Sequence, residues 1–312
     1  MPASSALIEV HSSKHQKERL PGMIHFRDYW ALTKPEVNFL ILVTTGVGFY
    51  LGCVKRGQPL SVISLSNALL GTLLVASGTG ALNQYLERRF DAQMRRTARR
   101  PLAAGRLNPS AVLAFGTVLA ATGSIYLALT CNLLASGLAT LTLLAYLFVY
   151  TPLKRKTPIC VLVGAFPGAM PPLIGWAAAT GHLNLAASVL YAMLFLWQFP
   201  HFMAIAWMYR EDYDRAGYMV LPKGIARVPV VILETLLPLT ALIAISLVQP
   251  STHRTLNVNL AATALLGSGF LYFGWAFAFK RSRLAARQLL TASILYLPLL
   301  YGLSGVFCSR AR

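Results

Sequence analysis

Charged residues are scarce in this 312-residue chain, where Asp, Glu, Lys and Arg together make up 12% of the total. Soluble domains carry about 25% charged residues, so this composition excludes a soluble globular fold. Acids are the rarest, with 10 Asp and Glu against 28 Lys and Arg, and the mean hydropathy is +0.57. Basic residues placed between apolar runs set the orientation of a polytopic membrane protein. Nucleic-acid binding is therefore not expected.

Paired cysteines and an N-terminal apolar segment are also missing. The four cysteines are scattered, with no CxxC pair and no neighbouring histidine, which argues against a disulfide or metal framework. Residues 1–28 are polar and basic without the apolar core of a signal peptide, and their acids do not suit a transit sequence. We expect residues 1–28 to be a disordered arm, residues 29–312 to be a single transmembrane domain, and the source to be bacterial rather than mitochondrial.

Long apolar runs, in contrast, are abundant. Nine runs approach the ~20 residues that a membrane-spanning helix needs; they lie at about 36–54, 65–86, 109–129, 131–151, 158–178, 185–208, 229–249, 258–279 and 288–307. With the N-terminus inside, 23 of the 28 Lys and Arg residues fall on the inner side. We predict an all-α integral membrane protein of nine transmembrane helices, with the N-terminus inside and the C-terminus outside. The fifth run contains Pro167, Pro171 and Pro172 and is not expected to be straight.

A polar stretch at 83–106 follows the second run. Asn83, Glu87 and Asp91 are spaced by four residues, so they share one helix face over roughly 12 Å. Seven arginines crowd the same stretch: Arg88, Arg89, Arg95, Arg96, Arg99, Arg100 and Arg106. An anionic group held through Mg²⁺ on the carboxylates, with arginines on its outer oxygens, would suit this pattern. The alternative is a solvated, positive-inside loop that happens to contain two acids.

A second polar segment follows the sixth run and ends in the acidic residues at 211–214. Acids on two inner loops would make a natural pair of facing metal sites. If the helix continues, His201 and Asp212 are eleven residues apart and share a face. An ionisable group inside a membrane is a functional candidate by default, and the alternative for His201 is a hydrogen-bonded core histidine. Tyr209 and Tyr213 are also typical of interfacial anchors.

A third cluster lies between the fourth and fifth runs. Tyr150 is followed by Pro152, which ends the helix, and by three cations at Lys154–Lys156. From composition alone, phosphate binding and plain topogenic charge explain this cluster equally well.

These motifs resemble those of the UbiA superfamily of intramembrane prenyltransferases. Asn83-x3-Glu87-x3-Asp91 is similar to its first acidic motif, NDxxDxxxD, with Gln84 and Glu87 as departures from it. Tyr150-x3-Lys154 matches its YxxxK element.

Other segments resemble the haem-farnesylating branch of this family in particular. They are Asp91-x2-Met94-x-Arg96-Thr97-x2-Arg100-Pro101-Leu102, Trp197-Gln198-Phe199-Pro200-His201-Phe202 and Arg210-Glu211-Asp212-Tyr213. The second motif of the family, DxxxD, is not intact, because Tyr209 and Tyr213 take its two acidic positions and Asp212 is adjacent. The resemblance extends from about Lys34 to Lys223.

The resemblance implies a nine-helix bundle around a central cavity, with its active site on the cytoplasmic side of the cell inner membrane. It implies transfer of a farnesyl group from farnesyl diphosphate to the 2-vinyl group of haem B, with addition of water, to give haem O. A haem A synthase is a possible acceptor of this product. The implied residues are Asn83, Glu87, Asp91 and Asp212 for Mg²⁺ and catalysis, Tyr150 for catalysis, and Arg96, Arg100, Lys154, Lys34, His201, Tyr209 and Tyr213 for substrate binding.

The role of His201 stays open among three. It would ligate the haem iron, take the proton lost when water adds, or only hydrogen-bond a neighbouring helix. Two alternatives for the whole protein also stand. One is an enzyme of the same fold with another acceptor, a quinone ring or chlorophyllide, against which the segments around Met94 and His201 argue. The other is a transporter, which should carry its ionisable groups near the bilayer midplane rather than at the inner ends of its helices.

Overall fold

The computed structural model describes residues 21–247 and 256–310, and these ranges contain helices and loops but no strand. In chain order the helices are α1 (Pro21–Leu32), α2 (Pro35–Arg56), α3 (Val62–Asp91), α4 (Pro109–Thr130), α5 (Leu133–Leu144), the π-helix η1 (Ala145–Tyr150), α6 (Thr151–Leu153), α7 (Cys160–Gly168), α8 (Pro171–Thr180), α9 (Leu185–Met208), α10 (Arg210–Arg215), the 3₁₀ turn η2 (Gly224–Ala226), α11 (Arg227–Leu247), α12 (Leu256–Lys280) and α13 (Arg283–Arg310). Within the described residues, nine helical stretches are long and apolar enough to cross a membrane, which confirms the predicted number.

Side chains at the helix starts explain where several spans begin. Asn108, Asn132 and Asn184 each accept a hydrogen bond from a backbone N–H two or three residues later, and so cap α4, α5 and α9. Such caps satisfy donors that the helix itself leaves unpaired. The division expected between the runs at 109–129 and 131–151 is confirmed, because α4 ends at Thr130 and Asn132 caps the next helix.

The proline-rich fifth span is broken, as predicted. It consists of α7 and α8, with Ala169 and Met170 between them. Pro171 cannot donate to the carbonyl one turn earlier, so the backbone leaves the regular helix just before it. The break lies inside the bundle, where Ala169 is fully buried.

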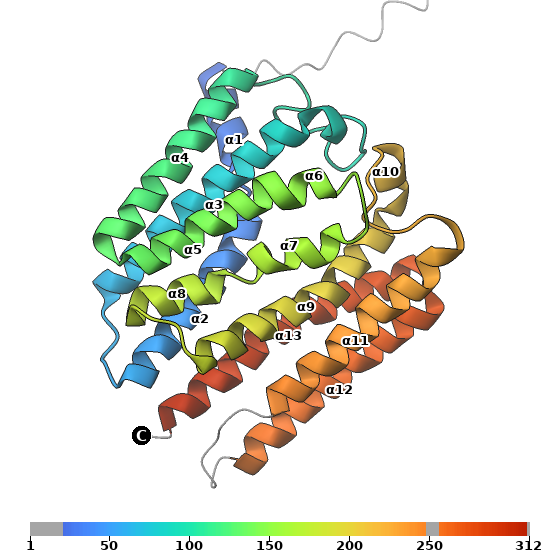
Figure 1. Ribbon diagram of the computed structural model, residues 1–312. Coiled ribbons are helices and arrows are strands. Elements are labelled where there is room, and N and C mark those ends of the chain that lie inside the picture. The colour runs from blue at the N-terminus through green and yellow to red at the C-terminus, as the bar shows by residue number, and fades with distance from the viewer. Residues whose placement is uncertain (1–20, 248–255, 311–312) are drawn as a thin grey trace, which may run out of the picture.

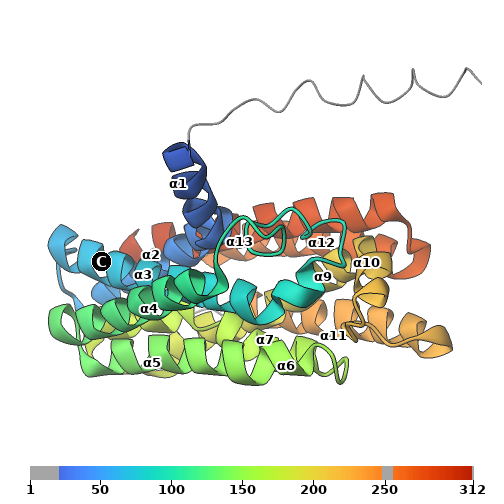
Figure 2. The ribbon, with the colours of Figure 1, turned by 90° about the horizontal axis from the view of Figure 1, so that it is seen from above.

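The spans lie side by side in a bundle (Figure 1). α3 packs on α4, α2 on α8, and α9 on both α11 and α13. Seen from above, α4 and α5 lie on one side of the bundle and α12 and α13 on the other, while α1 stands out from it (Figure 2). α6, α10 and the loop after α3 meet at the same end of the bundle, so all the predicted polar segments come together there.

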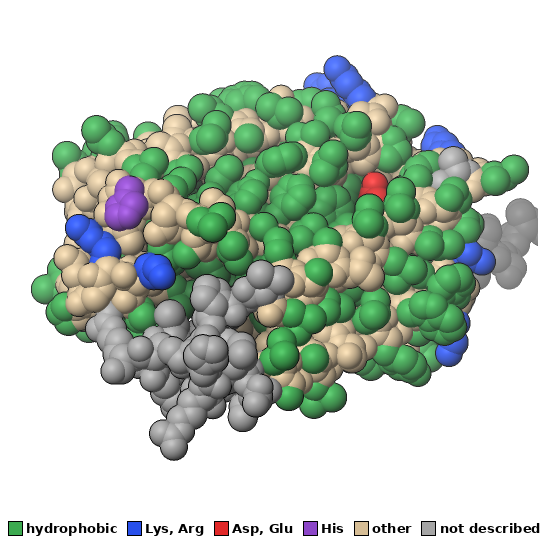
Figure 3. Space-filling model, turned by 60° about the horizontal axis from the view of Figure 1, so that its bottom comes forward, with side chains coloured by type: hydrophobic (Ala, Val, Ile, Leu, Met, Phe, Trp, Pro, Cys, Tyr) green, Lys and Arg blue, Asp and Glu red, His purple; other side chains and the backbone are tan. Residues whose placement is uncertain are grey.

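The surface of the bundle suits a lipid environment. Large apolar side chains project from the spans, among them Leu129 and Leu185, which are 81% and 80% exposed. On the face shown in Figure 3, hydrophobic side chains cover the middle of the molecule and Lys and Arg side chains lie towards its ends. Such a surface would aggregate in water, so the chain is a multi-pass membrane protein.

The arm expected at 1–28 lies mostly outside the described residues, which begin at residue 21. Residues 21–28 belong to helix α1. Asp28 is buried and forms an ion pair with Arg106, with 2.9 Å between Oδ1 and Nη2. Leu32, at the end of α1, is fully buried. The ion pair and the burial of Leu32 hold α1 against the bundle. Arg106, the partner of Asp28, is distant from it in the sequence.

Candidate functional site

The three acceptors at the end of α3 lie on one buried face. Asn83, Glu87 and Asp91 are 1%, 6% and 1% exposed. The prediction that they share a helix face is confirmed, since α3 runs without interruption from Val62 to Asp91. Their burial argues against the alternative of a solvated loop, because isolated buried carboxylates cost a large desolvation free energy and need partners.

Each of the three acceptors is held by a cation from a different segment. The pairs are Glu87 Oε1 with Lys154 Nζ at 2.9 Å, Asp91 Oδ2 with Arg100 Nη1 at 2.7 Å, and Asn83 Oδ1 with Lys34 Nζ at 2.8 Å. The Nδ2 amide of Asn83 also donates to Glu87 Oε2 at 3.0 Å and to Thr151 Oγ1 at 3.3 Å. The structure therefore gathers Lys34, Arg100 and Lys154 around the predicted acidic motif.

Lys34 reaches Asn83 from a strained backbone. Its φ of +53° is in the left-handed region, which is unfavourable for a residue with a side chain and before Pro35. Burial, followed by the nearby charge of Arg100, lowers the pKa of Lys34 to about 7. An anion bound beside it would restore the charged form. Strain of this kind is common at functional sites, which supports the substrate-binding role expected for Lys34.

Tyr150 and Lys154 lie together, as the YxxxK spacing suggested. The Lys154 ammonium lies 4.5 Å from the ring centroid of Tyr150 and 5.8 Å from that of Tyr146. Burial alone would lower the pKa of Lys154, but Tyr150 and Glu87 raise it well above its ordinary value. A Cβ at position 164 would lie 2.5 Å from Cε2 of Tyr150, so Gly164 leaves room for this ring.

Asp212 joins the two polar loops. Its Oδ1 accepts from Arg215 at 3.0 Å, and its Oδ2 accepts from the backbone N–H of Arg96 at 3.3 Å. The guanidinium of Arg96 lies 5.0 Å from the ring centroid of Tyr209. α9 ends at Met208 and α10 begins after Tyr209, so the premise of one continuous helix from His201 to Asp212 is wrong.

The oxygens on α3 suit a hard divalent cation. Asp91 Oδ1 is buried and no described residue hydrogen-bonds it, which leaves a carboxylate oxygen available to a ligand. Carboxylate and amide oxygens, as on Asn83, Glu87 and Asp91, are the ligands that Mg²⁺ takes from proteins. Among the described residues, however, no three His, Cys, Asp or Glu side chains are grouped to hold a metal ion, so Asp212 is not brought into such a set.

The segment Trp197–Phe202 connects α9 to two neighbours. The Nε2 amide of Gln198 donates to the carbonyl of Ala165 in α7 at 3.1 Å. On the other side, Trp197 Nε1 donates to the carbonyl of Ser293 at 2.8 Å, and His201 Nδ1 lies 2.8 Å from Ser293 Oγ. His201 therefore does hydrogen-bond a neighbouring helix, which was one of its three expected roles.

Four residues near these groups were not expected from the sequence: Tyr146, Thr151, Tyr218 and Ser293. Tyr146 lies one helical turn before Tyr150, and that spacing was a usable signal. Tyr218 packs edge-on against Tyr213, with 6.0 Å between ring centroids, and burial together with Glu87 raises its pKa. Nothing in the local sequence marks Tyr218 or Ser293.

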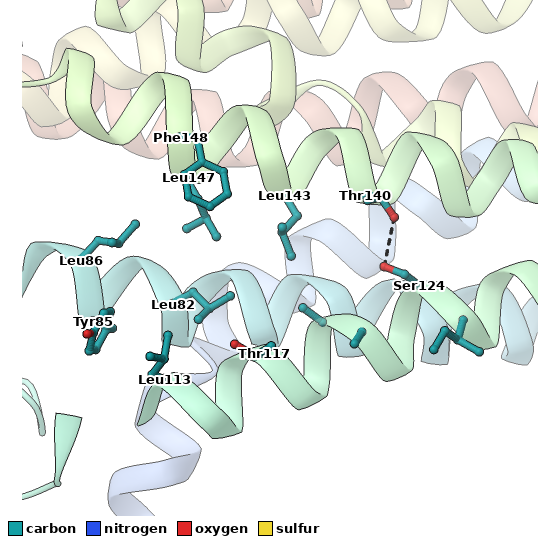
Figure 4. A pocket seen from close by; sticks show the side chains of 13 residues that line it. Leu82, Tyr85, Leu86, Leu113, Thr117, Ser124, Thr140, Leu143, Leu147 and Phe148 are labelled. Carbon is teal, nitrogen blue, oxygen red and sulfur yellow. Dashed lines mark hydrogen bonds between the residues drawn. The ribbon is translucent and has the colours of Figure 1, made fainter. Parts of the chain in front are cut away.

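An apolar pocket lies between α3 and the helices that pack on it. It has a volume of about 490 Å³ and lies between α3, α4, α5 and η1 (Figure 4). A smaller pocket of about 150 Å³ includes Glu87 in its wall. The two pockets share Leu86, Leu147 and Phe148 as lining residues, so the apolar pocket adjoins the one that Glu87 lines.

Comparisons with known proteins identify the family of the chain. Residues 41–297 match the UbiA prenyltransferase family. The chain is 47% identical over 289 residues to protoheme IX farnesyltransferase of Solibacter usitatus, covering 89% of this chain and 97% of that protein. It is 38% identical over 300 residues to the mitochondrial protoheme IX farnesyltransferase of Arabidopsis thaliana, covering 93% of this chain and 67% of that protein.

Solved structures share the fold. A digeranylgeranylglyceryl phosphate synthase superposes with a TM-score of 0.69 at 14% identity, covering 92% of this chain and all of that one. A UbiA homologue from Archaeoglobus fulgidus, bound to GPP and Mg²⁺, superposes with a TM-score of 0.58 at 14% identity, covering 88% of this chain and 99% of that one. At these identities the likeness establishes the architecture alone.

Proposed function

Because the chain belongs to the UbiA prenyltransferase family, we propose that it transfers a farnesyl group from farnesyl diphosphate to the 2-vinyl group of haem B, giving haem O. The observation that carries this proposal is the high identity, over almost the whole chain, to relatives named protoheme IX farnesyltransferase. The buried acids and cations at the end of α3 supply the chemistry that such a transfer needs.

The reaction begins when the C1–O bond of the farnesyl diphosphate breaks and its electron pair leaves with the diphosphate. The vinyl π electrons of haem B then form the new bond to C1, and water captures the resulting cation and loses a proton to become the hydroxyl group. Departure of the diphosphate is the step that needs help, because negative charge develops on the leaving oxygen. Apolar surroundings limit the access of water, which would otherwise trap the allylic cation.

Asn83, Glu87 and Asp91 would hold Mg²⁺, which supplies positive charge to stabilise the departing diphosphate. Glu87 and Asp91 are at present neutralised by Lys154 and Arg100. Once these carboxylates become ligands, both cations lose their partners and can contact phosphate oxygens. Lys34 contacts Asn83 on the same face of α3 and adds a third donor. Arg96, over Tyr209, is exposed and closes the loop side of the site.

The farnesyl chain is assigned to the apolar pocket between α3, α4, α5 and η1. Its lining is mostly aliphatic, with Leu82, Leu86 and Leu143 facing the space in Figure 4. The pocket adjoins a smaller one that Glu87 lines, and the diphosphate would lie on the Glu87 side. A hydrocarbon chain anchored at its polar end would fill such a space by burying apolar area.

The site belongs on the cytoplasmic side of the cell inner membrane in this proposal. The loops that meet at the α10 end carry most of the Lys and Arg residues, and such loops stay in the cytoplasm. The product would leave into the bilayer, where a haem A synthase is a candidate acceptor.

Mass spectrometry of haems tests the proposal. Membranes from cells that express the chain, supplied with haem B and farnesyl diphosphate, should contain haem O, and membranes with the empty vector should not. Prenylated quinone rings with no haem O would contradict the haem acceptor and favour another member of the family.

A further inference from the structure

Ser293 on α13 makes two contacts with one short segment of α9. Its carbonyl oxygen accepts a hydrogen bond from Trp197 Nε1 at 2.8 Å, and its hydroxyl lies 2.8 Å from His201 Nδ1. The Ser293 side chain is fully buried. Trp197 and His201 are one helical turn apart, and their rings are stacked with 4.6 Å between centroids. The plane and the position of the imidazole are therefore fixed by two different helices.

The hydroxyl of Ser293 determines which nitrogen of His201 carries the proton. Ser293 Oγ donates its single hydrogen to the carbonyl oxygen of Leu290, at 2.7 Å, in its own helix. It can then only accept from His201, so Nδ1 must carry a hydrogen. In the neutral imidazole this leaves the lone pair on Nε2. A hydrogen bond from the other ring nitrogen is how proteins commonly prepare a histidine for metal ligation.

The Nε2 atom is open to a ligand. His201 is partly exposed, and no described residue hydrogen-bonds its Nε2. The neighbouring ring of Phe202 packs edge-on against the imidazole, with 5.7 Å between centroids. The imidazole therefore has Nδ1 fixed by a hydrogen bond and an Nε2 that is unpaired among the described residues. The lone pair of Nε2 has a fixed direction and can bind a ligand.

We propose that Ser293 is a positioning residue that holds His201 in the Nδ1-protonated tautomer, so that Nε2 ligates the iron of the haem substrate. This inference rests on the proposed function for the identity of the acceptor. Ligation would fix the porphyrin against α9, about 10 Å of helix from Met208, where α9 ends near the acidic site. A placed acceptor matters here because the farnesyl cation reacts with whatever lies in front of it.

Haem binding to the purified full-length protein in nanodiscs tests the inference, with no farnesyl diphosphate present. Ferrous haem B bound to the wild type should show an iron–histidine stretch by resonance Raman spectroscopy, and His201→Gly should lose it and regain it with added imidazole. Ser293→Ala should lower the stretching frequency, because Nδ1–H loses its acceptor, and should weaken haem affinity about 10- to 100-fold. Ser293→Thr, which keeps the hydroxyl, should restore both.

Ser246→Ala is the matched control. Ser246 is buried and donates to the carbonyl of Leu242 in its own helix, but it does not contact a histidine. It should leave the frequency and the affinity unchanged. An unchanged spectrum in His201→Gly would overturn the ligation, and would point to a proton acceptor if haem O formation alone were lost. An unchanged frequency in Ser293→Ala would overturn the role of Ser293.

The haem O assay separates these failures from a failure of the proposed function. If the wild type forms haem O but its haem spectrum does not depend on His201, the function stands and the inference is wrong. If the wild type binds haem through His201 but transfers no farnesyl group, the ligation stands and the function is wrong. If it does neither, both are wrong.

Discussion

The ammonium group of Lys154 lies 2.9 Å from the carboxylate of Glu87, although 67 residues separate them in the chain. The two side chains are only 13% and 8% exposed, so the pair links the segment after α6 to α3 at a place that little water reaches. Its Coulomb attraction is strong, but so is the cost of desolvating both groups. A pair of this kind is kept for function more readily than for stability. Single and double substitutions of this pair can therefore separate a structural role from a functional one.

Removing one partner should destabilise the protein, and removing both should not. Lys154→Met leaves Glu87 uncompensated and should lower the free energy of unfolding by about 3–5 kcal/mol. The double variant with Glu87→Gln should recover most of this loss but form no haem O. Thermal unfolding in detergent and haem analysis measure the two effects. Recovery of turnover in the double variant would show that the pair is only structural.

Asp91 should be needed for turnover beyond what its ion pair with Arg100 contributes to stability. Asp91→Asn keeps the shape of the side chain but removes the charge that would bind Mg²⁺, and should reduce turnover by roughly 10²–10³-fold. Asp28→Asn is the matched control, since Asp28 is also buried and paired with an arginine but lies away from the acidic face. Near-normal haem O formation by Asp91→Asn would exclude Asp91 as a metal ligand.

The fold was predictable because its signals are local. A run of about 20 apolar residues can be recognised without knowing what it packs against. The same holds for the four-residue spacing of the acceptors at 83–91 and for the break before Pro171. Helix α1 was not expected because its 12 residues are too short to give such a signal, and its anchor Arg106 is distant in the chain.

The site was predictable only in part, for the same reason. The acids could be found by spacing, but their partners could not. Asn83 is 49 residues from Lys34, and His201 is 92 residues from Ser293. Asp212 was placed with the acids because acids on two inner loops suggested a pair of facing metal sites, whereas its carboxylate accepts from the backbone N–H of Arg96. Pairing across helices depends on packing, which no single segment encodes.

Arg96 should matter more than its neighbour Arg95. Both side chains are exposed, but the guanidinium of Arg96 lies over Tyr209, whereas Arg95 falls outside the motif that resembles the family. Lysine keeps the charge but loses the planar fork that contacts two oxygens and stacks on a ring. Arg96→Lys should therefore raise the KM for farnesyl diphosphate by several-fold and Arg95→Lys should not. Equal effects would mean that the segment acts only through its total charge.

The apolar pocket should set the length of the prenyl chain that the enzyme accepts. Ala121 on α4 lines the pocket, and a tryptophan there would fill its far part. Because the loss of even one or two buried methylene contacts is worth about tenfold or more, Ala121→Trp should lower kcat/KM for farnesyl diphosphate at least tenfold. It should leave geranyl diphosphate, which is shorter by one isoprene unit, nearly unaffected. Steady-state kinetics with both donors measures this ratio.

Leu129→Trp provides the control for this prediction. Leu129 lies on the same helix and is 81% exposed, but it does not line the pocket, so its replacement should change neither kcat/KM. A uniform loss with both donors in Ala121→Trp would mean that the tryptophan disturbs the packing of α3 on α4. An unchanged ratio with full activity would mean that the pocket holds a membrane lipid and that the farnesyl chain lies elsewhere. Only a selective loss of the longer donor places the chain between α3, α4 and α5, with its polar end at Glu87.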